Sequence, residues 1–248
     1  MEVALHPDEH TEAFNDRLKL IVSPAHTFGT DACLLAAFAL PRKNERCIDL
    51  GAGCGVIPFW WLSRGIRRVT ALELQEKATD QLRRSAALSG VADRINVVRA
   101  DLRDAKTLFP AGSFDRVSMN PPYTKAGHGI ASAAPADRLA RHETGVTLEE
   151  VCEAAAYLVR FGGSFSICLR PERLTDAMCA MRSAGLEPKR LRFVQKTAGT
   201  APWLFLLEGK KGRAPGLRVE APFVMYTETD SLTAEAKSVS NQAAIQTD

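Results

Sequence analysis

Short apolar runs alternate along most of the chain with longer segments in which apolar residues recur every three or four positions. The short runs are typical of buried strands, and the longer segments are typical of helices that cover a sheet. Glycines close several of the helical segments, as at Gly90 and at Gly162-Gly163. The pattern predicts strands at residues 46–50, 69–74, 95–99, 114–119 and 164–169, and helices at residues 56–63, 75–89, 148–160 and 174–183.

Two further apolar runs, at residues 191–195 and 203–208, follow each other without a helical segment between them. Strands that are joined directly pair antiparallel, whereas strands separated by a helix usually pair parallel. We therefore expect an α/β protein with a mostly parallel sheet, helices on both of its faces and an antiparallel strand at its edge.

The beginning of the chain lacks this alternation. The first 27 residues are polar and predict irregular structure, and an apolar helix is then expected at residues 31–40. Thr30 or Asp31 is the expected N-cap of that helix, and Pro41 is expected to end it.

The chain as a whole shows no internal repeat. We divide it into an N-terminal extension with a helix at residues 1–44, one α/β domain at residues 45–210 and a C-terminal tail at residues 211–248. From about Thr227 the tail is polar and nearly free of aromatic residues, so we expect it to be mobile or weakly docked.

Composition adds few constraints. The chain has 248 residues, of which 46% are hydrophobic and 25% charged, as in an ordinary globular protein. The formal net charge of +3 permits a nucleic-acid partner without requiring one.

The polar, acidic start is unlike a signal peptide, and no apolar run approaches the roughly 20 residues of a membrane helix. We therefore expect a cytoplasmic protein without a membrane partner, as a monomer or a weak homodimer.

The cysteines do not have the spacing of metal ligands. None of them forms a C-x-x-C pair, and most lie in apolar runs, so we expect buried, reduced thiols and no metal site. The six are Cys33, Cys47, Cys54, Cys152, Cys168 and Cys179.

A glycine-rich turn joins the first strand of the predicted sheet to the first helix that follows it. Its glycines are Gly51, Gly53 and Gly55, and they allow a sharp turn and a close approach of a ligand to the backbone. In an open α/β sheet ligands bind beyond the carboxyl ends of the strands. Glu73 ends the second strand, where its carboxylate can accept both hydrogens of a ribose diol.

A dinucleotide site is the competing interpretation of this turn. Its G-x-G-x-x-G pattern requires a glycine where this chain has Val56. Asp49 precedes the turn, and a carboxylate there disfavours a pyrophosphate and favours a ligand with a cationic amino group. The methionine part of S-adenosylmethionine carries such a group.

A third carboxylate, Asp101, ends the third strand, and the segment with Leu102 is expected to hold and pack against an adenine ring. Each acid also has an ordinary explanation: a loop cap for Asp49, a surface charge for Glu73 and a helix N-cap for Asp101. Three acids at successive strand ends beside a glycine turn nevertheless favour a nucleoside cofactor.

The fourth strand is followed by Asn120, Pro121, Pro122 and Tyr123. The two prolines fix the backbone and remove two N–H donors, which leaves the Asn120 side-chain oxygen and the Pro121 carbonyl as acceptors. A conjugated amino group is a poor nucleophile, and two acceptors on its hydrogens turn its lone pair towards an electrophile. Tyr123 is expected to stack on a planar group. A plain Asn-Pro turn is the alternative for this segment.

Taken together, the glycine turn and the Asn120–Tyr123 segment resemble the class I methyltransferases that modify amino nitrogens. The finer resemblance, over about residues 20–210, is to bacterial tRNA1(Val) adenine-N6 methyltransferases. Three further stretches carry it: residues 28–36, residues 140–143 (Ala-Arg-His-Glu) and residues 170–174 (Arg-Pro-Glu-Arg-Leu).

That resemblance implies a Rossmann-like, seven-stranded, mostly parallel sheet whose last strand is antiparallel. It implies S-adenosylmethionine as cofactor, an adenosine next to the anticodon of a tRNA as substrate, and Asn120–Tyr123 as the catalytic residues. One departure is that Ser85 and Ser89 stand where such enzymes often carry asparagines. The expected cofactor-binding residues are Thr30, Asp49, Gly51, Gly53, Gly55, Glu73, Asp101, Leu102 and Asn120.

Binding of tRNA is expected to fall to surface charges and loops. A long segment at residues 124–147 is expected to form a lid, with His128 and His142 as hydrogen-bonding or RNA-contacting residues. Basic clusters are usually solvated surface, so only a continuous stripe near the site would serve this purpose. The candidates are Arg138, Arg141, Arg170, Arg173, Lys189, Arg190, Arg192, Lys210, Lys211 and Arg213.

Three alternatives stay open. A protein glutamine-N5 methyltransferase presents the same amino-group chemistry, but such enzymes carry a helical N-terminal domain, and about 45 residues precede the first strand of this sheet. A DNA adenine methyltransferase usually has a larger recognition domain. A non-catalytic RNA-binding module with the same fold is the third, and the intact Asn120–Tyr123 segment counts against it.

Overall fold

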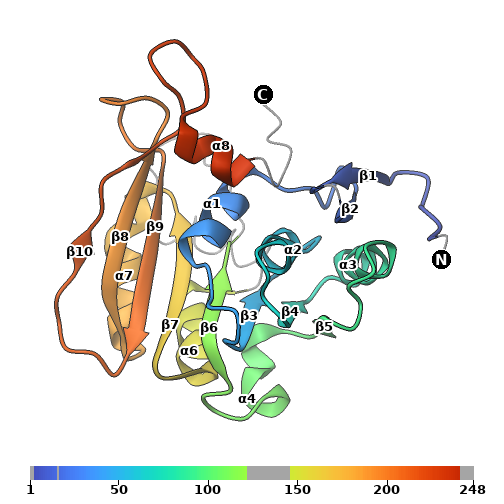
Figure 1. Cartoon of the computed structure of the whole chain (residues 1–248). Helices are drawn as coiled ribbons and strands as arrows, with labels where there is room; N and C mark the ends of the chain where they lie inside the picture. The colour runs from blue at the N-terminus through green and yellow to red at the C-terminus, as the bar shows by residue number, and fades with distance from the viewer. Residues whose placement is uncertain (1–2, 16, 122–145, 241–248) are drawn as a thin grey trace, which may run out of the picture.

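A computed structural model of the chain describes residues 3–15, 17–121 and 146–240 (Figure 1). Seven strands form the body of one sheet in the order β5–β4–β3–β6–β7–β9–β8, and β9 is antiparallel to both of its neighbours. The remaining neighbours in this series pair parallel. The seven strands are β3 (Cys47–Leu50), β4 (Val69–Glu73), β5 (Ile95–Arg99), β6 (Phe114–Met119), β7 (Val159–Leu169), β8 (Leu186–Gln195) and β9 (Leu204–Lys211).

This order confirms the Rossmann-like class I methyltransferase fold, with its reversed last strand. The expectation that the reversed strand forms the edge is wrong, because β9 lies between β7 and β8. On its other side β8 pairs with two short parallel strands, β10 (Arg218–Val219) and β11 (Phe223–Val224). The described sheet therefore has nine strands.

Helices cover both faces of the sheet and bury two separate apolar clusters (Figure 1). The first cluster lies under α1, α2 and α3, and the second under α4, α6 and α7. Helix α2 is almost wholly apolar, and seven of its residues are buried, as expected for a helix enclosed by the sheet and α1. The bounds are α1 (Thr30–Phe38), α2 (Val56–Ser63), α3 (Glu76–Leu88), α4 (Ala105–Leu108), α6 (Leu148–Leu158) and α7 (Leu174–Ser183), with short 3₁₀ turns at Leu102–Asp104 and Pro171–Arg173. No described helix is both long and apolar enough to span a bilayer.

The N-terminal stretch that was expected to be irregular contains a two-stranded antiparallel hairpin, β1 (His10–Ala13) and β2 (Lys19–Val22). It packs against α3, whose Ser85 and Ser89 hydroxyls bond the backbone of β2. The expected N-cap of α1 also changes, because Gly29 occupies that position without a side-chain cap.

The start of β7 differs from the sequence prediction. Helix α6 ends at Leu158, and residues 159–163, which include the predicted helix end and its stop signal, belong to β7. Gly163 is required there because a Cβ atom would lie 2.7 Å from the carbonyl oxygen of Asp115. The glycine pair therefore permits close strand pairing rather than ending the helix.

The described part of the tail includes a helix that packs on the domain. Helix α8 (Ala234–Ser240) contacts α1 and β11, and Ala236 and Val239 are buried. From Thr227 to Val239 these are the two buried residues, so the expectation of a mobile or weakly docked tail stays a prediction. Residues 241–248 lie outside the described residues.

Candidate functional site

The glycine turn follows β3 and makes three left-handed backbone steps, with φ of 62° at Gly51, 54° at Gly53 and 98° at Gly55. Only glycine adopts such angles readily. A Cβ atom on Gly55 would lie 2.9 Å from Leu82 on α3, so this glycine also permits close helix packing. At Gly53 no described atom lies within 4 Å of the same position, so this side of the turn is open to a ligand.

Glu73, at the end of β4, holds the glycine turn in place. One carboxylate oxygen accepts a 2.8 Å hydrogen bond from the amide of Gly53, and the other accepts a 2.8 Å bond from the amide of Gln75. The side chain is buried, and each oxygen keeps a second acceptor position. The carboxylate can therefore fix the turn and still accept hydroxyl groups from a ligand.

Asp49, near the end of β3, is almost completely buried and accepts a 2.5 Å hydrogen bond from the Ser118 hydroxyl on β6. Burial raises the pKa of Asp49 to about 8; the Ser118 bond opposes this rise, and the charge of Glu73 adds to it. A buried carboxylate of this kind is stabilised in its ionised form by a nearby cation.

Asp101 lies at the same edge of the sheet, because the amide that precedes it, that of Ala100, bonds the carbonyl of Glu73. Its carboxylate is occupied by Arg103, which bonds it through Nε at 3.0 Å and through its backbone amide at 2.9 Å. The Arg103 side chain holds the pKa of Asp101 below its usual value. The N-cap interpretation thus describes Asp101 in this structure, and Leu102 beside it is buried in the second apolar cluster.

Asn120 and Pro121 follow β6 and are half-buried. The pairing of β6 with β3 aligns Met119 with Leu50, so Asn120 comes next to Gly51 at the carboxyl edge. The Asn120 side-chain oxygen accepts a 3.1 Å hydrogen bond from the thiol of Cys168, which is fully buried on β7. Cys168 was expected to be only a buried thiol, and nothing in its local sequence indicated this contact.

The structure thus brings most of the expected cofactor residues to one edge, at the ends of four adjacent strands. Thr30 is half-buried at the first turn of α1, a helix that packs against α2 and β7. Pro122, Tyr123, Arg138, Arg141, His128, His142 and most of the expected lid lie outside the described residues.

Two residues near this edge were missed at the sequence level. The turn after β2 is closed by paired backbone bonds between Ser23 and His26, and the charge of Glu73 acts on the His26 imidazole. Burial nevertheless lowers the pKa of His26 overall. The negative charge of Glu12, on β1, helps to raise the pKa of the Cys54 thiol in the glycine turn. Glu12 lies on the hairpin and His26 in the turn that follows it, and the sequence pattern did not predict the hairpin.

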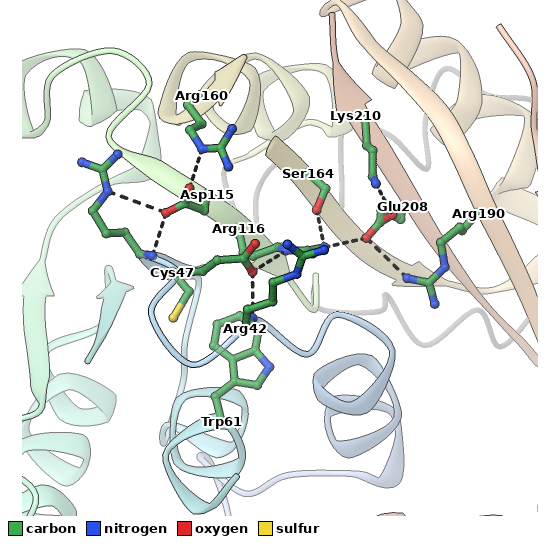
Figure 2. Close-up of polar contacts among 12 residues, drawn as sticks. Arg42, Cys47, Trp61, Asp115, Arg116, Arg160, Ser164, Arg190, Glu208 and Lys210 are labelled. Atoms are coloured by element: carbon green, nitrogen blue, oxygen red, sulfur yellow. Dashed lines mark hydrogen bonds and ion pairs between the residues drawn. The ribbon is translucent and has the colours of Figure 1, made fainter. Parts of the chain in front are cut away.

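The described basic candidates do not form one stripe. Arg170 and Arg173 follow β7 at the carboxyl edge, where Arg170 bonds the carbonyl of Trp203 at 3.0 Å and Arg173 bonds Asp176 at 2.8 Å. Arg192 is bound by Glu235 of α8. Of the others, Lys189 and Arg190 lie in the middle of β8, and Lys210, Lys211 and Arg213 lie towards the opposite, amino edge of the parallel strands. Figure 2 shows Arg190 and Lys210 on either side of Glu208.

One cluster has the residue types of a metal site, His6, Glu9 and Asp80. Arg84 bonds the Glu9 carboxylate at 2.6 and 2.7 Å and Asp80 at 2.7 Å. Because the guanidinium already neutralises these acids, the cluster is an ion-pair network that ties residues 6–9 to α3.

Comparison with solved structures supports the fold. A predicted O-methyltransferase from Agrobacterium tumefaciens superposes with a TM-score of 0.70 at 23% identity, covering 87% of this chain and 98% of the other. TrmN from Thermus thermophilus gives a TM-score of 0.52 at 26% identity, covering 72% of this chain and 48% of its own.

Comparison of sequences identifies the family. Residues 34–157 match the family described as "Conserved hypothetical protein 95". The tRNA1(Val) (adenine(37)-N6)-methyltransferase of Tolumonas auensis is 30% identical, over 72% of this chain and 74% of its own length. The protein of that name from Cronobacter sakazakii is 34% identical, over 72% of this chain and 73% of its own. The chain belongs to the tRNA1(Val) (adenine(37)-N6)-methyltransferase family.

Proposed function

We propose that this protein transfers a methyl group from S-adenosylmethionine to the exocyclic N6 of an adenosine next to the anticodon of a tRNA. Both sequence relatives carry the name of that reaction. The observation that carries the proposal is the position of Asn120 beside the glycine turn, which follows from the pairing of Met119 with Leu50.

The residues at the carboxyl edge fit the proposed cofactor. Asp49 would pair with the amino group of its methionine part, and that cation would offset the cost of ionising a buried acid. Glu73 would accept hydrogen bonds from the ribose hydroxyls, and the open side of Gly53 would let the ligand approach the backbone closely. Leu102 would pack against the adenine, whereas Asp101 would have to share its carboxylate with Arg103 to bond the adenine amino group. When bound, the cofactor supplies a methyl group on a positively charged sulfur.

Asn120 and Pro121 would orient the substrate nitrogen. The Asn120 oxygen and the Pro121 carbonyl would each accept one hydrogen of the amino group, which turns its lone pair away from the conjugated ring. This is catalysis by position and electrostatics, and no strong general base is required. We propose that Pro122 fixes the loop and that Tyr123 stacks on the target base.

Two further properties are part of the proposal. A tRNA substrate places the protein in the cytoplasm, and the free cysteines, five of them buried, fit a reducing compartment. We also propose that it acts as a monomer or a weak homodimer.

The test uses tritiated S-adenosylmethionine with three acceptors from cells that lack the gene: bulk tRNA, release factor and DNA. Label in tRNA, released as N6-methyladenosine after digestion, supports the proposal. Label in protein alone would establish the glutamine-N5 alternative, and label in DNA alone would establish a DNA methyltransferase. Cofactor binding without label in any acceptor would favour the non-catalytic module.

A further inference from the structure

A basic pocket of about 480 Å³ lies beside the first half of β8 and the carboxyl end of β9, at the other side of the sheet from the candidate methyl-transfer site. Five of its lining residues are cations: Lys189, Arg190, Lys210, Arg213 and Arg218. Two carboxylates bind them, Glu208 and Glu220. Five cations against two carboxylates leave a formal charge of +3, which equals the net charge of the whole chain.

Two of the pocket cations, Arg190 and Lys210, are paired with a buried acid, Glu208. Glu208 is 1% exposed on β9, and three cations converge on it, as Figure 2 shows: Arg116 from β6 at 2.9 Å, Arg190 from β8 at 3.5 Å and Lys210 from β9 itself at 3.9 Å. Arg116 also bonds the Ser164 hydroxyl on β7 at 2.8 Å. A buried carboxylate with several cations around it fixes their side chains before any ligand arrives.

The loop after β9 forms the outer wall of the pocket. Lys189 donates a 3.2 Å hydrogen bond to the carbonyl of Ala214, and its ammonium group lies beside Gly216. Gly212 and Gly216 both have left-handed backbone angles, with φ of 68° and 136°, so the loop turns sharply around the basic side chains.

An exposed aromatic ring lies next to the basic pocket. Phe161, at the start of β7, is 73% exposed, and its ring covers Gly212 so closely that a Cβ atom there would overlap it. A Cβ atom on the neighbouring Gly162 would be 3.7 Å from a guanidinium nitrogen of Arg160 and 3.7 Å from one of Arg213. Both guanidinium groups thus lie near the residue that follows Phe161, although that of Arg160 is also paired with Asp115. An exposed ring close to cationic side chains is suited to stacking on an unpaired base whose phosphates contact the cations.

We propose that this pocket and Phe161 form a second RNA-binding site, which takes the phosphates and one unpaired base of the substrate outside its target region. The inference rests on the proposed function for the identity of the RNA. The pocket and the ring together favour a ligand that is both a polyanion and a carrier of planar bases. A neutral ligand would not pair with the five cations, and an isolated phosphate would not stack on the ring.

The distance between the two sites defines the kind of RNA that reaches both. Phe161 lies near the start of β7, and the pairing of β6 with β7 places Asn120 level with Cys168 near its end, which corresponds to roughly 23 Å along an extended strand. An RNA whose target base lies at the carboxyl edge must therefore extend along the molecule to contact the amino edge. A full-length tRNA has that extent, whereas a short stem-loop around the target adenosine does not gain the second set of contacts.

The experiment measures binding of labelled full-length tRNA and of the isolated stem-loop, at several salt concentrations. The pocket variant is Lys189→Glu/Arg213→Glu, and Phe161→Ala tests the ring without changing charge. A matched control is Lys43→Glu/Arg83→Glu, which replaces two exposed cations elsewhere and gives the same change in net charge, from +3 to −1.

We expect the pocket variant to weaken tRNA binding and to reduce the slope of log affinity against log salt by about 1.5 to 2, since each lost cation contact removes about 0.7 to 0.9. Phe161→Ala should weaken tRNA binding by about fivefold or more, with an unchanged salt slope. Binding of the stem-loop, cofactor affinity and the unfolding midpoint should stay at the wild-type level in both.

The inference fails if the control weakens tRNA binding as much as the pocket variant, or if the stem-loop loses as much affinity as the tRNA. It also fails if both pocket and ring variants bind tRNA as the wild type does. Because binding is measured without methyl transfer, a protein that binds tRNA through the pocket but methylates none would contradict the proposed function and leave this inference standing.

Discussion

The buried thiol of Cys168 on β7 donates a hydrogen bond to the side-chain oxygen of Asn120, with 3.1 Å between the sulfur and the oxygen. The thiol is the donor in this contact, so the oxygen of the Asn120 amide faces Cys168 and its NH₂ group faces away. The orientation of the proposed catalytic amide therefore depends on a residue of the neighbouring strand, 48 positions away in the sequence.

Replacement of Cys168 tests this dependence. We expect Cys168→Ala to lower kcat by up to about tenfold, the effect of losing one positioning hydrogen bond, while KM for the cofactor stays near normal. Cys168→Ser keeps a donor and should recover most of kcat. Cys152→Ala, at an equally buried position in the other apolar cluster, is the control for packing loss and should change stability without changing kcat. An unchanged kcat in Cys168→Ala would contradict the positioning role.

Removal of the Asn120 side chain tests the acceptor itself. Asn120→Ala should lower methyl transfer by about 100-fold or more, the usual effect of deleting one group that acts on the reacting atoms. Cofactor affinity, measured by calorimetry, should stay near normal, because the glycine turn and Glu73 are untouched. Retained activity would refute the role given to Asn120.

The elements that the sequence predicted well are those with a local cause. Helix α2 and strands β5 and β6 begin and end as predicted, because apolar runs and glycine stops define them. The glycine turn, Asp49 and Glu73 were found for the same reason, since their spacing relative to predicted strands is a local property.

The elements that were missed depend on contacts distant in sequence. The β1–β2 hairpin is short and mostly polar on β1, and it is held by α3 through bonds that span 64 to 70 residues. The start of β7 was assigned to a helix because its glycine pair is also a common helix stop. Lys211, from β9, donates hydrogen bonds to the carbonyls of Ala156 and Val159, and α6 ends at Leu158, two residues before the predicted end.

Asp101 shows why some site residues stay undecided at the sequence level. A carboxylate that ends a strand and precedes a short helical turn has the same local pattern whether it caps the turn or binds a ligand. Only the neighbouring Arg103 side chain, bonded to both carboxylate oxygens, distinguishes the two in this structure. The sequence likewise gave no indication of His26 or Glu12, because both depend on the hairpin.

The titration of Asp49 predicts a pH dependence of stability. In the unfolded chain its pKa is close to 3.8, whereas burial raises it to about 8 in the folded protein. Between these values the folded protein holds a proton that the unfolded chain has released. The contribution of Asp49 to the free energy of unfolding is therefore complete below about pH 4 and falls as pH rises towards 8, by at most about 1.4 kcal/mol per pH unit.

Asp49→Asn removes this titration and keeps the shape of the side chain. We expect the difference in unfolding free energy, variant minus wild type, to grow steadily in favour of the variant from pH 5 to pH 8. Urea unfolding of both proteins at each pH measures it, and groups common to both cancel in the difference. A constant difference across that range would show that Asp49 does not titrate there.

The last prediction concerns the attachment of the hairpin. The Ser85 hydroxyl on α3 accepts a 2.8 Å hydrogen bond from the amide of Ile21 and donates a 2.7 Å bond to the carbonyl of Gln81, and it is fully buried. Ser85→Ala leaves the buried amide of Ile21 without this acceptor, so we expect a loss of about 1 to 3 kcal/mol in the free energy of unfolding. Ser183→Ala, at an exposed position at the end of α7, is the matched control and should stay within about 0.5 kcal/mol of the wild type.

Hydrogen exchange localises the effect: the amides of β2 should exchange faster in Ser85→Ala while those of β3 stay protected, because the hairpin opens separately from the sheet. Equal acceleration in β2 and β3 would contradict this, since it would mean that the serine stabilises the fold as a whole and does not specifically fasten the hairpin to α3.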